Sequence, residues 1–125
     1  TEGVAGLVQR TPGAIGYVEA TAARRSGLPV AELRNRAGAF VAPTVASAGA
    51  AAAAVAAAAP ATTDFRLALV DAPGSASYPI ASLTWLLLDA PPRDTAAARA
   101  VVSFARWALR EGAPSARALG YAPLP

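Results

Sequence analysis

Apolar residues recur with helical spacing near both ends of the chain. Val4, Leu7 and Val8 stand at i, i+3 and i+4 within Glu2–Arg10, which predicts a short helix that ends at the turn Thr11-Pro12-Gly13. A longer stripe predicts a helix from about Thr95 to Glu111, with Asp94 as its N-cap. This stripe consists of Ala98, Val101, Val102, Ala105, Ala108 and Leu109.

Alternating patterns predict short strands between these helices. They are Ala14–Glu19, Val30–Arg34, Ala39–Val41, Phe65–Val70 and Pro79–Leu88. The pattern of Pro79–Leu88 is the strongest, because Ala81, Leu83, Trp85 and Leu87 line one face while the other face turns apolar at its end. Two apolar faces are typical of a covered, central strand. In Ala14–Glu19, Gly16 indicates that another element packs close to the backbone.

An alanine-rich segment fills the middle of the sequence. Pro43-Thr44 opens it and Pro60 stops it, so we expect a helix over Val45–Ala59 with Thr44 as N-cap. A disordered low-complexity linker is the alternative. The run is too short to span a bilayer as a helix. Short helices over Ala20–Ser26 and Ser115–Leu119 complete a mixed order of elements, which predicts an α/β fold.

The amino-acid composition limits the kinds of chemistry that the chain can perform. The chain of 125 residues has no Cys, Met or His, and its net charge is +3. All eleven basic residues are arginines scattered along the sequence, which argues against a nucleic-acid surface. Without His or Cys, we expect no metal site, no cofactor and no acid–base or thiol catalysis. No basic segment precedes an apolar run at the start, so no signal peptide is expected within these residues.

Candidate site residues all have a plainer structural interpretation. Gly74, Ser75 and Ser77 could line an anion site, but a turn between two strands fits them better. Ser75, Ser77 and Ser82 lack a His or Lys base, which argues against a hydrolase. Asp64, Asp71 and Asp89 are interpreted as turn and cap residues. The aromatic residues that could stack on a ligand are better explained as core residues; they are Tyr17, Tyr78, Trp85 and Trp107. We therefore assign no catalytic, phosphate-binding or metal residue.

Four segments, in order and at consistent spacing, resemble the phosphate-binding proteins that serve bacterial ABC importers. They are EGVAGLVQRTPGAIGYVE (Glu2–Glu19), NRAGAFVAPT (Asn35–Thr44), LVDAPGSASYPIASLTWLLL (Leu69–Leu88) and FARWALREGAPSARALGYAPLP (Phe104–Pro125). The resemblance implies a periplasmic-binding-protein fold of two α/β lobes with phosphate in the cleft between them. It places residues 1–77 in the C-terminal part of the second lobe. Residues 78–125 would cross over and form the C-terminal part of the first, incomplete lobe.

The resemblance also implies where the ligands of phosphate lie. The family holds phosphate with hydroxyls and backbone N–H groups near the mature N-terminus, an Asp, and an Arg beside a Ser-Gly-Thr loop. These motifs lie upstream of the matched segment, and this chain contains no Ser-Gly-Thr. No phosphate ligand is therefore carried over. We expect a chain truncated at both ends, or one part of a split protein.

Two functional hypotheses follow. The first is the C-terminal portion of a periplasmic or cell-surface phosphate-binding protein. Its partners would be inorganic phosphate, bound through the missing upstream half, and the membrane subunits of an ABC transporter. The alternative is a free-standing, lobe-like interaction module that binds no phosphate and self-associates through Pro79–Leu88, Phe104 and Trp107.

Overall fold

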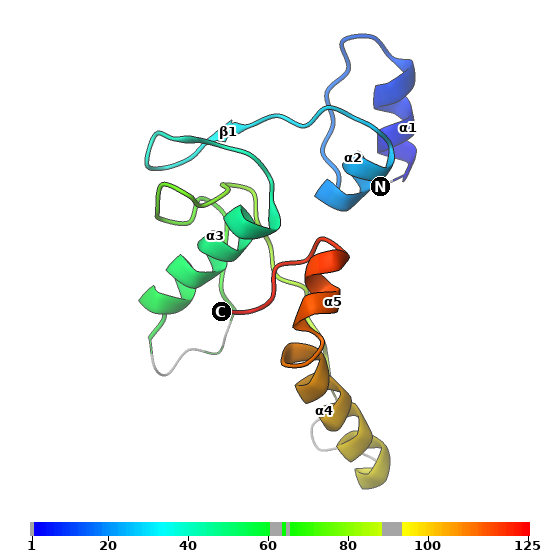
Figure 1. The fold of residues 1–125 in the computed structure, drawn as a ribbon, viewed down its shortest axis with the longest axis vertical. Coiled ribbons are helices and arrows are strands. Elements are labelled where there is room, and N and C mark those ends of the chain that lie inside the picture. Colours follow the sequence, from blue (N-terminus) through cyan, green and yellow to red (C-terminus); the bar gives the residue numbers. More distant parts are fainter. Residues whose placement is uncertain (1, 61–63, 65, 89–93) are drawn as a thin grey trace.

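In the part of the chain that the structure describes, extended segments join several helices and one small sheet (Figure 1). The computed structural model describes residues 2–60, 64, 66–88 and 94–125. The helices are α1 (Glu2–Arg10), α2 (Ala20–Arg25), α3 (Val45–Ala58), α4 (Thr95–Leu109) and α5 (Ala113–Ala118). The strands are β1 (Leu33–Arg34) and β2 (Phe40–Val41). The predicted mixture of helix and strand is thus present, with little strand.

The helices begin where the capping residues predict. Thr44 caps α3, because its side-chain oxygen accepts from the Ser47 N–H at 3.0 Å and the Ser47 hydroxyl accepts from the Thr44 N–H at 2.9 Å. This reciprocal pair forms a capping box, with Ser47 in the position usually held by Glu or Gln. Asp94 caps α4 through the N–H groups of Ala96 and Ala97. The alanine-rich segment is therefore a helix, as predicted, and not a linker.

The two strands form an antiparallel hairpin that is shorter than predicted. Leu33 pairs with Val41, and Arg34 pairs with Phe40. The turn closes when the Asn35 N–H donates to the Ala39 carbonyl at 2.8 Å and the Gly38 N–H donates to the Asn35 carbonyl at 2.8 Å. Gly38 has a φ of +85°, which glycine adopts without steric cost.

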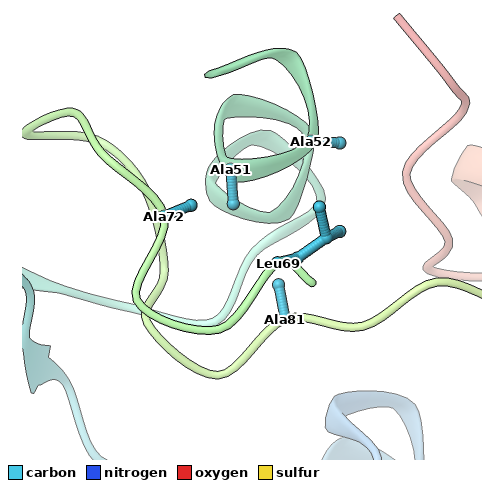
Figure 2. Packing of buried hydrophobic residues seen from close by; sticks show 5 residues of the cluster. All are labelled: Ala51, Ala52, Leu69, Ala72 and Ala81. Carbon is cyan, nitrogen blue, oxygen red and sulfur yellow. The ribbon is translucent and has the colours of Figure 1, made fainter. Parts of the chain in front are cut away.

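Small side chains make up the main hydrophobic cluster, which lies between α3 and the chain that follows it (Figure 2). Ala51 points from α3 toward Leu69 and Ala81, and Leu69 is the one large residue of the buried set among the described residues. Val55 and Leu83 pack against the cluster. The remaining members are Ala52 and Ala72. Because alanine buries little apolar area, this cluster contributes a modest hydrophobic stabilisation.

Three predicted strands are not formed among the described residues. Ala14–Glu19, the described part of Phe65–Val70 and Pro79–Leu88 carry no strand assignment, and Phe65 itself lies outside the described residues. The prediction of a covered central strand is wrong here, since Leu87 is 89% exposed. The alternating pattern indicates which side chains are apolar enough to be buried. A strand also requires a neighbouring backbone with which its N–H and C=O groups form hydrogen bonds. Among the described residues, no ladder of backbone hydrogen bonds joins these segments to a neighbour, although the Pro79 carbonyl accepts from the Asp71 N–H at 2.9 Å.

Gly16 shows what the first of these segments contacts. A Cβ atom at this position would lie 2.8 Å from Val4 Cγ1 and 3.0 Å from Val8 Cγ2, so the backbone lies directly on α1. The predicted close approach is therefore confirmed. Burial of the segment is not, because Ile15 is 97% and Tyr17 is 90% exposed.

Helix α4 extends away from α3 and the hairpin (Figure 1). It matches the predicted Thr95–Glu111 helix closely but buries none of its residues, so its apolar stripe is uncovered. After α5, the C-terminal tail returns toward α3, where the Cβ of Ala122 lies 3.9 Å from the Cβ position of Gly49. Within the described residues, no helix has the length and apolar character needed to cross a membrane.

Candidate functional site

The best sequence candidate for a binding loop, Gly74–Ser77, is closed on itself. The Ser77 hydroxyl donates to the Pro73 carbonyl at 2.7 Å, and the Ser77 N–H donates to the Gly74 carbonyl at 3.3 Å. Ser77 is only 1% exposed, whereas Ser75 is exposed. Gly74 has a φ of +104°. The one buried hydroxyl of the loop is therefore used to close the turn.

Asn35 holds this loop to the hairpin. Its side-chain Nδ2 donates to the carbonyls of Gly74, Ser75 and Ser77 at 3.2, 2.9 and 3.1 Å. Its Oδ1 accepts from the N–H groups of Ala37 and Ala39 at 3.1 and 3.0 Å. The residue is 5% exposed, so one buried amide joins segments about forty positions apart in the sequence.

This arrangement presents the wrong groups for an anion. A phosphate site needs N–H groups or cations that converge on one point. Here three carbonyl oxygens converge on the Asn35 amide. The geometry supports the interpretation of Gly74–Ser77 as a structural turn. Asn35 follows directly after the segment Val30–Arg34 that was predicted as a strand, and no sequence pattern indicates its contact with this loop.

The candidate carboxylates and serines that the structure describes are not gathered into a catalytic group. Asp64 pairs with Arg66 at 3.2 Å in full contact with solvent, and Asp71 lies exposed in its turn. Asp89 lies outside the described residues. Ser82 is exposed and has no hydrogen bond from its side chain to another described residue. The part of the chain that the structure describes contains no cluster of three acidic residues able to hold a metal ion.

The aromatic residues divide into one half-buried and several exposed side chains. Tyr78 is half-buried, and this burial raises the pKa of its hydroxyl above the ordinary value. Tyr17, Trp85 and Trp107 are 90%, 53% and 51% exposed, so the predicted core roles of these three are wrong among the described residues. The ring centroid of Phe104 lies 5.9 Å from that of Trp107, and Phe104 is itself exposed. Their exposure fits an apolar surface that lacks a covering partner better than it fits a ligand pocket.

Known proteins are similar to nearly the whole chain. The phosphate-binding protein PstS of Xylella fastidiosa (strain 9a5c) is 37% identical over 124 residues, which is 99% of this chain. The phosphate-binding protein PstS of Pasteurella multocida (strain Pm70) is 36% identical over 99% of the chain. The resemblance to phosphate-binding proteins is thereby confirmed. The phosphate-binding protein PstS of Methanocaldococcus jannaschii is 37% identical over 98% of the chain.

The match to these phosphate-binding proteins covers only part of each. The chain spans 34%, 36% and 34% of the three relatives, about a third of their length. No protein-family profile matches the chain. The 125 residues are thus similar to one segment of these longer phosphate-binding proteins.

Proposed function

We propose that the chain forms part of a protein that captures inorganic phosphate for import by an ABC transporter. The observation that carries this proposal is the similarity, over 99% of the chain, to a protein named for phosphate binding. Such a protein binds its ligand through hydrogen bonds and transforms nothing. The relatives are named as binding proteins, which agrees with the expectation that the chain is not an enzyme.

Within such a protein, this chain supplies supporting structure and none of the groups that bind phosphate. In its best candidate loop, Gly74–Ser77, three backbone carbonyls accept from the Asn35 amide, and the loop offers no anion site. This supports the view that the ligands of phosphate lie in the rest of the protein. We place residues 1–77 in the C-terminal part of the second lobe. Residues 78–125 form the crossover and the C-terminal part of the first lobe.

The place of action follows from the proposed task. A protein that hands phosphate to an importer works outside the cytoplasmic membrane, in the periplasm or at the cell surface. Its partners there are inorganic phosphate and the membrane subunits of the transporter.

Calorimetric titration with inorganic phosphate tests the proposal. The proteins to compare are the 125-residue chain, the Xylella fastidiosa relative, and a chimera in which this chain replaces the matched third of that relative. We expect no heat of binding from the chain alone and tight binding by both longer proteins. A chimera that unfolds cooperatively yet binds no phosphate would rule the proposal out.

Self-association is the second candidate, and the exposed apolar residues of the chain favour it. Trp85, Leu86 and Leu87 are 53%, 63% and 89% exposed, which is unusual for neighbouring residues in a stable monomer. Light scattering over a range of concentrations tests this candidate. A monodisperse monomer at every concentration would argue against it.

A further inference from the structure

A sharp reversal after α5 turns the chain back toward α2 and α3. The Gly120 N–H donates to the Arg117 carbonyl at 2.9 Å, and the Tyr121 N–H donates to the Ala116 carbonyl at 2.9 Å. These two bonds form a Schellman motif, in which a glycine in the left-handed conformation ends the helix. Gly120 has a φ of +89°. The turn therefore fixes the direction in which residues 121–125 leave α5.

Gly120 also lies directly on α2. A Cβ atom at this position would lie 2.6 Å from Thr21 Cγ2 and 2.5 Å from Arg24 Nη2, both too short for a real contact. Arg24 is exposed, so its guanidinium can move aside. The β-branched side chain of Thr21 is stiff and cannot move so easily. The approach of α5 to α2 thus requires a residue without a side chain at position 120.

The residues that follow Gly120 lie along the first half of α3 (Figure 1). The Cβ atom of Ala122 is 3.9 Å from the Cβ position of Gly49, which is an ordinary van der Waals distance. Residues 122–125 line one hollow together with Val45, Ala46 and Gly49. The end of the described chain therefore touches two helices that lie far before it in the sequence.

These contacts join parts of the chain that the proposed function assigns to different lobes. Helices α2 and α3 belong to residues 1–77, whereas α5 and the segment after it belong to residues 78–125. Two lobes that close around a ligand move as bodies about the few places where they are joined. A contact that persists between the lobes restricts this movement to a rotation about the contact.

We propose that Gly120–Pro125 is a strap that stays bound to α2 and α3 and forms the pivot about which the two lobes open and close on phosphate. This inference rests on the proposed function. A pivot fits better than a latch that opens, because every contact of the strap is made within this chain and its direction is fixed by the turn at Gly120. The strap acts by positioning the lobes and does not itself touch phosphate.

An engineered disulfide tests whether the strap stays on α3. The chain contains no Cys, and the separation of 3.9 Å between the Cβ positions of residues 49 and 122 suits a disulfide. We expect the double variant Gly49→Cys/Ala122→Cys to form this bond within one molecule when the chain alone is treated with oxidised glutathione. The two single variants control for links between molecules. A double variant that keeps the helical circular dichroism of the parent but forms no internal disulfide would overturn the proposal.

The same disulfide distinguishes a pivot from a latch in the chimera described above. A pivot does not move when the lobes close, so the oxidised and reduced forms should bind phosphate with the same affinity. If the strap had to leave α3, the disulfide would deplete the binding-competent state, and the affinity would fall about tenfold or more. Such a loss, reversed by a reductant, would show a latch and contradict the proposal.

A substitution at Gly120 tests the contact with α2. In the chimera, Gly120→Ala should weaken phosphate binding about fivefold or more, because the collision with Thr21 changes the angle between the lobes. Thr21→Ser removes Cγ2 and should restore most of the affinity. Gly27→Ala is the matched control, since Gly27 has a φ of +64° but open space at its Cβ position. Equal affinities of the Gly120→Ala and Gly27→Ala variants would show that the close approach has no such role.

The two kinds of readout separate this inference from the proposed function. A chimera that binds phosphate while its double cysteine variant forms no disulfide would refute the strap alone. A chimera that forms the disulfide but binds no phosphate would refute the function, and with it the role as a pivot, while the contact of the strap with α3 would stand.

Discussion

The side chain of Asn35 forms more hydrogen bonds than any other polar side chain that the structure describes. It satisfies two N–H groups of its own turn and three carbonyls of a distant loop, all at hydrogen-bond distance. The first pair of contacts could be expected from the sequence, because Asn commonly bonds to the backbone two residues on. The contacts with Gly74, Ser75 and Ser77 could not, since they depend on how the chain returns past the hairpin after α3.

Asn35→Ala should release both the turn and the loop. Leaving the buried Ser77 carbonyl without its donor costs about 1–3 kcal/mol, so we expect the amides of Ala37 and Ala39 to exchange about fivefold faster or more. Arg36→Ala is the matched control, because Arg36 is exposed in the same turn, and should change exchange little. Equal effects of the two substitutions would show that the amide contacts contribute nothing.

At the scale of elements, what the sequence predicts well is local. Caps, turn glycines and helical spacing fixed α1, α3, α4 and the hairpin to within a few residues, because each depends on neighbours in the sequence. The strands Ala14–Glu19 and Pro79–Leu88 failed for the opposite reason. Their pattern indicates burial correctly for Ala81 and Leu83, but pairing requires partners at a distance. The assignment of no ligand residue depends on the resemblance and stays a prediction.

The two capped helices should respond differently to loss of their caps. Thr44→Ala should destabilise α3 by about 1 kcal/mol and speed exchange of the Ala51 and Ala52 amides about fivefold, because these residues lie in the buried cluster. Asp94→Ala should reduce the helical circular dichroism of α4 but leave those amides unchanged, since α4 buries nothing. Matching losses of Ala51 protection in both variants would mean that α4 supports the cluster after all.

At the scale of the molecule, the chain has more apolar surface than its own residues cover. A cluster in which Leu69 is accompanied by alanines is small beside the exposed set on Ile80–Leu88 and α4. The local elements are therefore well specified while the global assembly is left open. Such a balance is expected when local sequence signals agree with one another but the exposed apolar residues find no cover within the described part of the chain.

The positions of the two tryptophans have a practical consequence. Trp85 lies in the extended segment Ile80–Leu88 and Trp107 lies in α4. About half of each side chain is exposed to solvent. The fluorescence of an indole ring shifts to shorter wavelength when water is removed from around it. The chain therefore contains two intrinsic fluorescent reporters on its exposed apolar surfaces. Their emission should follow the arrival of a partner in real time, without a dye or a substitution.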